Sequence, residues 1–384
     1  MRVGLVHKRL DFKGGTERDL FRTAEGLRDL GHEVHLFCSE YVVAAPHGII
    51  AHTLPVVPMG RTARLWSFAV NAPSIIEAQR CDVVMSFGRT LRHDVLRSGG
   101  GTHRGFLDQL GRNAGLGRRL WQKASIYHRS LLNLEKRQFS APQLKKIIAV
   151  SAEVKRDILA NYPVPEGKIV VLYNGVDGER FRLRRCDGTR RMIRERWQIP
   201  SDAPLVLFVG SGFRRKGLER LISAWKSPGL AHVYLLIVGS DARAARYKAR
   251  VERIYDDRII FAGRQEEVEN YYAAADVVAL PALQEAFGNV VLESLASGVP
   301  VLVSRSVGAA EVLSGPLTAG IVDHSEDPNE LAVKLIALLE RARDPRCAEE
   351  ARKVACRYSW HNHFKNLESL LIEIAKPHAK TNLV

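Results

Sequence analysis

The sequence of 384 residues predicts an α/β protein with two domains, each a parallel sheet flanked by helices. Two patterns carry this prediction. Residues 1–40 contain a short apolar strand, a glycine turn, an amphipathic helix and a second strand, and residues 204–304 alternate apolar runs with helical segments. Between them, residues 174–197 are strongly basic and poor in apolar periodicity, which indicates a linker plus a surface segment.

The first domain begins with strands at residues 2–7 and 33–38, joined by a helix that starts near Thr16. Thr16 and Asp19, three positions apart, indicate a capping box, and Gly31 is expected to end the helix. Because a crossover helix joins parallel strands, this unit predicts a parallel sheet. Further strands are expected at 82–87, 146–150 and 168–172.

The second domain repeats the pattern more regularly, as a doubly wound α/β domain. Its strands are expected at 204–210, 233–239, 258–263, 276–281 and 299–304. From residue 344 onward the apolar spacing predicts helices that end in a polar tail.

The composition is typical of a globular chain and excludes a disordered or collagen-like protein, with 46% hydrophobic and 26% charged residues. Lys and Arg total 57 against 42 Asp and Glu, a formal net charge of +15. This excess favours an anionic partner. Nucleic acid, an acidic membrane and a phosphorylated ligand all remain open at this point.

The cysteines favour a reducing, cytoplasmic compartment, because they are five in number, scattered and never in a C-x-x-C pair. No run of ~18 apolar residues occurs, so we expect neither a signal peptide nor a membrane span. The protein is expected to touch a membrane without crossing it.

Two glycine-rich turns follow predicted strands and precede helices. Gly14 and Gly15 lie ahead of the first helix, where backbone amides attract anions and glycines allow a phosphate to approach. Residues 210–217, GSGFRRKG, add adjacent cations at the carboxyl end of a strand, which suits a diphosphate. An ordinary tight turn at the first site and a solvated basic turn at the second are the alternatives.

Two glutamates, Glu285 and Glu293, lie eight positions apart around the start of a predicted helix. At ~100° per residue they are ~80° apart around the helix, so both can face one cleft. Glu293 sits among apolar residues and needs a partner, which the hydroxyls of a sugar or ribose can supply. The alternative is a buried ion pair or an exposed helix face.

These segments resemble the retaining, nucleotide-sugar-dependent glycosyltransferases of family 4, over nearly the whole chain. The glutamate pair with seven intervening residues is the most specific element. The resemblance is carried by the glycine pair, AVS at 149–151, LYNGVD at 172–177, GSGFRRKG at 210–217, YYAAADVVALPALQEAFGNVVLESLASGVPVLVS at 271–304, and Trp360. Within the family, the sequence is most similar to the lipopolysaccharide core enzymes that add glucose to inner-core heptose.

The resemblance implies the GT-B fold, two Rossmann-like domains facing across a cleft. Residues 1–175 would bind the acceptor, residues 176–356 the nucleotide sugar, and a helix in 357–384 would cross back to the first domain. The implied reaction moves a hexose, glucose from UDP-glucose, onto a lipid-linked phosphorylated oligosaccharide with retention. It needs no cofactor and no metal, and the enzyme would be cytoplasmic and peripheral on the inner membrane.

The resemblance also assigns residues. Arg215 and Lys216 would neutralise the departing diphosphate, Glu285 would lie near the sugar hydroxyls, and His103 would lie beside the transferred sugar, as the catalytic set. Glu293 would hold the donor ribose. The remaining donor-binding positions implied are Gly14, Gly15, Gly210, Ser211, Arg264, Phe287, Gly288, Asn289 and Val290.

The segment 104–146 holds ten Lys or Arg against Asp108 and Glu135, which is over half of the excess charge. An apolar stripe at helical spacing lies opposite part of this charge. The stripe comprises Leu120, Ala124, Tyr127, Leu131 and Leu134, and the opposing cations are Arg118, Arg129 and Lys136. Two interpretations are open: a helix that packs on the core and exposes its basic side to solvent, or a surface that binds anionic lipid. We expect that the helix is packed and that its charge binds the membrane.

Three rival functions remain. The charge permits a nucleic-acid-binding protein, but no recognition module appears and the aromatic residues do not interleave the cations, so no nucleic acid is expected. A nucleotide-sugar epimerase of the same fold would bind the donor and need no acceptor. An inactive scaffold is disfavoured because both glutamates and both cations are present.

Overall fold

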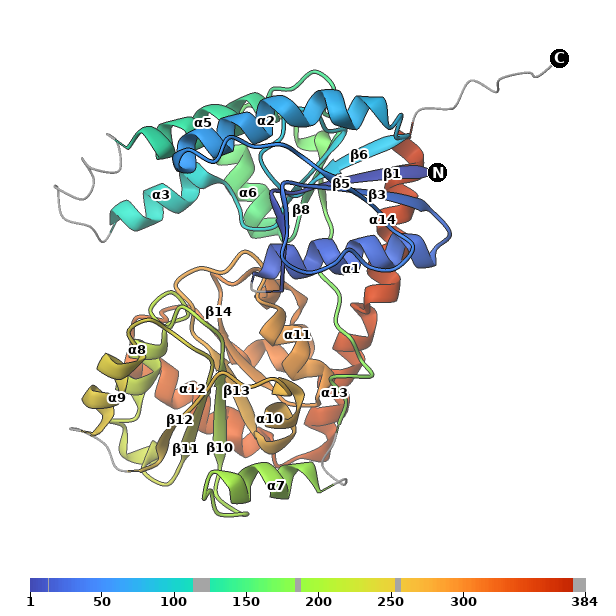
Figure 1. The fold of residues 1–384 in the computed structure, drawn as a ribbon. Coiled ribbons are helices and arrows are strands. Elements are labelled where there is room, and N and C mark those ends of the chain that lie inside the picture. Colours follow the sequence, from blue (N-terminus) through green and yellow to red (C-terminus); the bar gives the residue numbers. More distant parts are fainter. Residues whose placement is uncertain (13, 113–124, 184–187, 253–256, 376–384) are drawn as a thin grey trace. The chain divides into compact units, whose positions relative to one another are not determined.

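The computed structural model describes residues 1–384 except 13, 113–124, 184–187, 253–256 and 376–384 (Figure 1). The chain forms two compact units, residues 1–172 with 363–384 and residues 173–362. The division thus lies at 172/173, where the sequence placed it at 175/176. The chain returns to the first unit within α14 (Trp360–Ile374), at residue 363 rather than 357.

The first unit contains a seven-stranded parallel sheet in the order β5-β3-β1-β6-β7-β8-β9. Its strands are β1 (Arg2–Val6), β3 (Glu33–Cys38), β5 (Ile50–Thr53), β6 (Val83–Ser86), β7 (Val95–Ser98), β8 (Lys146–Ala149) and β9 (Ile169–Val171). Its helices, besides α14, are α1 (Gly15–Asp29), α2 (Gly60–Ala78), α3 (His103–Arg112), α5 (Ile126–Phe139) and α6 (Ala152–Asn161). The strand order changes direction between β1 and β6, and β1 pairs in parallel with β3 on one side and with β6 on the other.

Helices cover both faces of this sheet, because alternate residues of each strand point to opposite sides. Leu5 of β1 belongs to the core that α1 and α14 close, whereas its neighbour Val6 belongs to the core that α2 closes. Figure 1 shows α1 and α2 on opposite sides of the strands. Both faces are therefore apolar, as buried parallel strands require.

Two strands of the seven-stranded sheet were not predicted. β5 is a short and largely exposed edge strand, and β7 carries Arg97 in its middle, so neither has an apolar run. The predicted capping box is also wrong. Gly14 is the N-cap residue of α1, and the Asp19 carboxylate binds Arg97 instead of the helix start. The helix does end ahead of Gly31, which has a positive φ of 86°.

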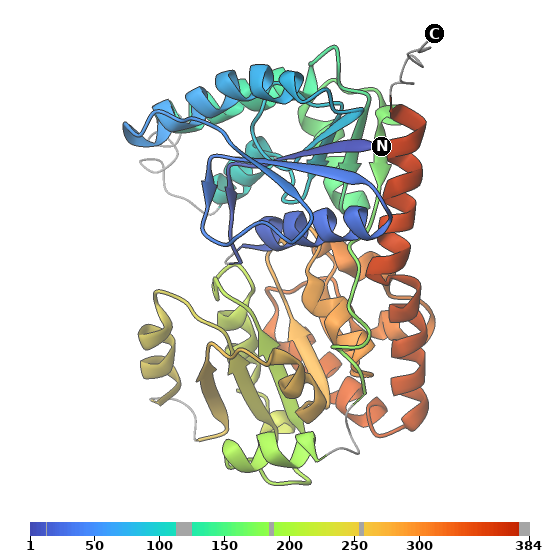
Figure 2. The ribbon, with the colours of Figure 1, turned by 45° about the vertical axis from the view of Figure 1, so that its right-hand side comes forward.

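The second unit contains a six-stranded parallel sheet in the order β12-β11-β10-β13-β14-β15. Its strands are β10 (Leu205–Val209), β11 (Tyr234–Val238), β12 (Ile259–Gly263), β13 (Val277–Leu280), β14 (Val301–Ser304) and β15 (Ile321–Val322). Its helices are α7 (Thr189–Arg196), α8 (Leu218–Ala224), α9 (Ala244–Glu252), α10 (Val268–Ala274), α11 (Asn289–Ala296), α12 (Pro328–Arg341) and α13 (Pro345–Arg357). Helices α8, α9 and α12 close one large apolar core on the sheet (Figure 2).

The basic segment 174–197 was expected to be a linker and a surface segment, but part of it is helical and packed. Its last part is helix α7, which packs against α10. Arg194 of α7 is 2% exposed and its guanidinium binds Asp276 at 3.0 Å. A basic sequence therefore conceals a buried ion pair.

Both sheets have a switch point, where the strand order reverses between β1 and β6 in the first unit and between β10 and β13 in the second. In open parallel sheets, ligands bind outside the carboxyl ends of the strands at this point. Among the described residues, no helix combines the length and hydropathy needed to cross a bilayer.

Candidate functional site

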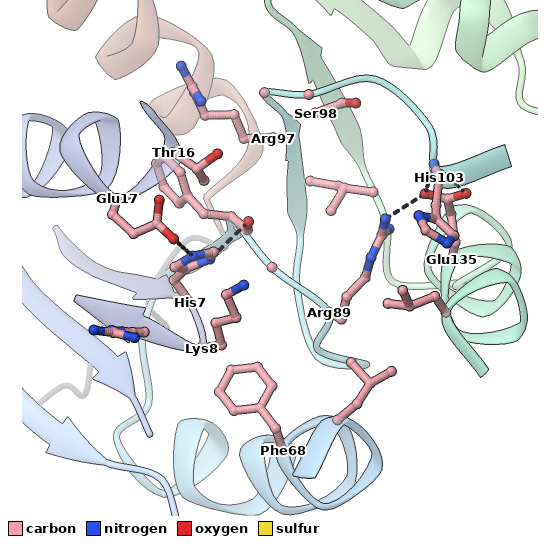
Figure 3. A pocket seen from close by; sticks show the side chains of 18 of the residues that line it. His7, Lys8, Thr16, Glu17, Phe68, Arg89, Arg97, Ser98, His103 and Glu135 are labelled. Atoms are coloured by element: carbon pink, nitrogen blue, oxygen red, sulfur yellow. Dashed lines mark hydrogen bonds and ion pairs between the residues drawn. The ribbon is translucent and has the colours of Figure 1, made fainter. Parts of the chain in front are cut away.

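A cavity of about 610 Å³ opens at the carboxyl ends of β1, β6 and β7 in the first unit (Figure 3). Its size falls in the range of small-molecule sites, ~300 to 1,000 Å³. Aromatic and aliphatic side chains form much of its wall, including Phe68, Phe87 and Phe139, and several cations and carboxylates complete it. The cavity therefore lies where the topology predicts a ligand.

His7 directly follows β1 and spans the switch point. Its Nδ1 lies 3.0 Å from the carbonyl oxygen of Phe87, which follows β6, so this nitrogen carries the proton. Its Nε2 lies 3.5 Å from Glu17 Oε1, and the imidazole lowers the pKa of Glu17. The Glu17 side chain folds back over Gly14, where an added Cβ would lie 1.9 Å from Oε2. Glu17, and not Asp19, is thus the acidic side chain at the start of α1.

His103, which the resemblance implied as a catalytic residue, begins α3 and lines the cavity. Its Nε2 lies 3.0 Å from Nδ1 of His128. Burial and the neighbouring Arg89 guanidinium lower the pKa of His103 to about 4. The ring is therefore neutral at pH 7 and serves as a hydrogen-bonding group rather than as a cation.

The second unit brings together three residues of the predicted catalytic set. Arg215 and Lys216 follow β10, and Glu285 follows β13, so the switch point places them side by side. The Arg215 guanidinium donates to Glu285 Oε2, and Lys216 Nζ lies 3.7 Å from the same oxygen. Lys216 is largely buried, whereas about half of the Arg215 side chain is exposed.

Glycines make this cluster possible. Gly217 has a φ of 79°, and an added Cβ would lie 1.8 Å from the carbonyl oxygen of Pro281, so the turn after β10 can approach β13 only with glycine there. Gly288 has a φ of 91°, and a Cβ there would lie 3.3 Å from Glu285 Cγ. The side chain of Lys216 passes over Gly210, 2.5 Å from the place of a Cβ.

Glu293 and Asn289 lie on α11, in the turns that follow Gly288. The Tyr272 hydroxyl donates to Glu293 Oε2 at 2.6 Å, and burial together with this carboxylate raises the pKa of Tyr272. Asn289 accepts from the Asn174 amide at 2.9 Å. A buried phenol therefore fixes the carboxylate that the sequence placed at the donor ribose.

The other predicted donor residues are distributed as follows. Phe287 and Val290 are buried and support the start of α11. Ser211 and Arg264 are exposed, after β10 and β12 respectively, at the same sheet edge as the cluster. Gly15 faces open space, since an added Cβ would meet no atom within 4 Å. Nothing in the fold therefore requires glycine at position 15.

The arrangement in the second unit suits an anion beside a polyhydroxylated ligand. Two cations and one carboxylate meet at the strand ends, and a helix N-terminus without a side-chain cap follows. Among the described residues, no group of three or more His, Cys, Asp or Glu is arranged to hold a metal ion.

Sequence analysis missed several residues of the first unit. His7 and Arg89 follow apolar strands, and that position was the available signal. Asp19 and Arg97 form an ion pair at 2.9 Å that is almost fully buried, between α1 and β7. No local pattern marks this pair, because its members lie 78 residues apart.

Comparisons with known proteins agree with this geometry. Residues 13–180 match the family described as Glycosyltransferase Family 4, and residues 189–354 match Glycosyl transferases group 1. The lipopolysaccharide glucosyltransferase WaaG of Escherichia coli K12 is 25% identical over 307 residues, 78% of this chain and 79% of WaaG.

Solved structures show the same fold. The crystal structure of WaaG, a glycosyltransferase involved in lipopolysaccharide biosynthesis, matches 96% of this chain and 99% of its own, with a TM-score of 0.78 and 22% identity. The structure of Anabaena Alr3699/HepE in complex with UDP-glucose covers 97% of this chain and 100% of the HepE chain, with a TM-score of 0.72 and 18% identity. The chain is therefore a glycosyltransferase of the GT-B fold, with a family 4 domain followed by a group 1 domain.

Proposed function

We propose that the enzyme transfers glucose from UDP-glucose, with retention of configuration, onto a lipid-linked phosphorylated saccharide such as the heptose of the lipopolysaccharide inner core. The observation that carries this proposal is the cluster of Arg215, Lys216 and Glu285 at the β10 and β13 strand ends. The similarity to WaaG supports the sugar and the acceptor class, and the HepE complex supports the donor.

We assign a role to each side chain of the cluster. Lys216 and Arg215 stabilise the charge that develops on the departing diphosphate, which is commonly the largest contribution to such catalysis. Glu293, fixed by Tyr272, holds the ribose hydroxyls. Glu285 binds hydroxyls of the sugar and is not the nucleophile. The acceptor oxygen attacks from the face that the diphosphate leaves, and a phosphate oxygen takes its proton. The reaction needs no metal.

The cavity of the first unit supplies the acceptor site. Its carboxylates have partners within the unit: Asp11 binds Arg9, Glu40 binds Arg64, Glu135 binds Arg89, and Glu17 faces His7. Two further cations, Lys8 and Arg61, line the cavity and have no ion-pair partner among the described residues. This surplus favours a saccharide that carries phosphate.

The experiment that tests the function is a transfer assay with radiolabelled UDP-glucose and truncated lipopolysaccharide, before and after phosphatase treatment. We expect transfer with retention, and a KM for the acceptor about tenfold higher after dephosphorylation, since one charged contact is worth ~1.5 kcal/mol. Sugar isomerised without any acceptor would establish the epimerase instead. Equal KM values before and after phosphatase treatment would contradict the proposal that the enzyme recognises phosphate on the acceptor.

We also propose that the enzyme acts from the cytoplasmic face of the inner membrane as a peripheral protein. Helices α3 and α5 pack together, and their exposed residues include the apolar Phe106 and Ile126 and the cations Arg104, Arg129 and Lys136. In the described part of the predicted stripe, Leu134 is buried, whereas Tyr127 and Leu131 are part-buried and line the cavity. The remaining stripe positions, Leu120 and Ala124 with Arg118, lie outside the described residues.

Vesicle sedimentation tests this location. At moderate salt, we expect binding to vesicles with acidic lipid and little binding to neutral ones, at ~1 kcal/mol per cation near the surface. The double variant Arg129→Gln, Lys136→Gln should weaken binding about tenfold or more. Equal sedimentation with both kinds of vesicle would contradict the proposal.

A further inference from the structure

Helix α5 places two buried polar side chains behind the cavity of the first unit. Glu135 and Gln138 lie one turn apart and are 1% and 0% exposed. Polar groups at this depth are costly unless they are hydrogen-bonded. Their partners therefore show what the helix holds in place.

Glu135 binds the start of α3 and the loop after β6 together. Its carboxylate accepts from the backbone N–H of His103 at 2.8 Å and from that of Arg104 at 3.3 Å. The Arg89 guanidinium lies 2.7 Å away, and the Tyr162 hydroxyl donates at 2.6 Å. Figure 3 shows Arg89 and His103 converging on this carboxylate at one side of the cavity.

Gln138 also holds the loop after β6. Its amide nitrogen donates to the carbonyl oxygens of Gly88 at 2.8 Å and Thr90 at 3.0 Å. Its amide oxygen accepts from Arg89 at 3.2 Å. Glu135 and Gln138 therefore both hold Arg89, and its guanidinium cannot turn freely into the cavity.

We propose that Glu135 is a positioning residue for the acceptor, a proposal that rests on the proposed function. The contacts of Glu135 are to its neighbours in the first unit. Glu135 sets the wall of the cavity, because one carboxylate joins the loop after β6, through Arg89, to the start of α3, through the backbone N–H of His103. This buried carboxylate orients two cavity-lining residues, which is how binding groups are preorganised.

The structure offers a matched control. Tyr162 binds the same carboxylate but is not among the residues that line the cavity. Replacing Tyr162 by Phe removes a hydrogen bond from Glu135 on the side away from the ligand. Any effect of weaker packing should therefore appear in Tyr162→Phe as well as in Glu135→Gln.

The test is steady-state transfer by the full chain with UDP-glucose and phosphorylated acceptor. For Glu135→Gln we expect an acceptor KM raised about tenfold, with the Kd for UDP unchanged. For Tyr162→Phe we expect the acceptor KM of the wild type. An unchanged KM in Glu135→Gln, or an equal rise in both variants, would overturn the positioning role. Wild type that binds UDP but transfers to no acceptor would instead refute the proposed function.

A second variant covers the possibility that Glu135→Gln does not fold. Arg89 is about one quarter exposed, so Arg89→Gln breaks the same contact from the solvent side. Burial is the larger cause of the low pKa of His103 and the Arg89 charge the smaller, so NMR titration of ¹³C-labelled histidine should show a partial rise of this pKa from about 4 in Arg89→Gln. We also expect a raised acceptor KM. An acceptor KM in Arg89→Gln equal to that of the wild type would overturn the proposal.

Discussion

Replacing Glu285 by Gln is expected to remove most of the transferase activity while tightening the binding of UDP. The loss of turnover should be about 10²-fold to 10³-fold, the cost of removing one preorganised group from a transition state. UDP binding should strengthen about fivefold, corresponding to ~1 kcal/mol for a partly exposed ion pair. The reason is that Glu285 engages Arg215 and Lys216 in this structure, and the donor diphosphate needs the same two cations.

Calorimetry with uridine, UMP and UDP separates this effect from a general change in the site. The gain in affinity should be absent for uridine, which has no phosphate, and largest for UDP. Glu195→Gln, an exposed carboxylate on α7, is the control and should change no affinity. Weaker UDP binding in Glu285→Gln would mean that the carboxylate supports the phosphate site instead of competing for it.

The meeting of Lys216 and Glu285 at one sheet edge was predictable because strand ends are visible in a sequence. Apolar runs that end at Val209 and Leu280 place the following residues, Lys216 and Glu285 among them, at one sheet edge once the sheet is parallel. The direct ion pairs between Glu285 and the two cations were not predicted. They depend on how far the turn at Gly217 approaches β13, which is a property of the packed backbone.

The wall of the cavity in the first unit was not predictable. Glu135 was counted as one acid within a basic stretch, and its partners Arg89 and His103 lie 46 and 32 positions away along the chain. Hydropathy assigns such a residue to the surface, because isolated charges are rarely buried. Only tertiary contacts show that a full set of partners makes its burial tolerable.

Arg194 in the second unit is likewise a charged residue whose burial the local sequence does not indicate. Its replacement has the largest expected effect on stability. Its guanidinium binds Asp276 and donates to the carbonyl oxygens of Ala274, Pro200 and Ala203. Breaking a buried ion pair from one side costs ~3–5 kcal/mol. We expect Arg194→Ala to lower the melting temperature of this unit by roughly 6–20 °C, measured by calorimetry.

Arg191 provides the matched control, since it lies on the same short helix, is 80% exposed and pairs with Glu195. Arg191→Ala should cost less than ~0.5 kcal/mol. Arg194→Lys distinguishes charge from shape. A lysine keeps the positive charge but has one ammonium, which cannot reach the acceptors that the planar guanidinium spans on separate segments. Lysine should therefore recover only a minor part of the loss, and a full recovery would mean that the charge alone anchors α7.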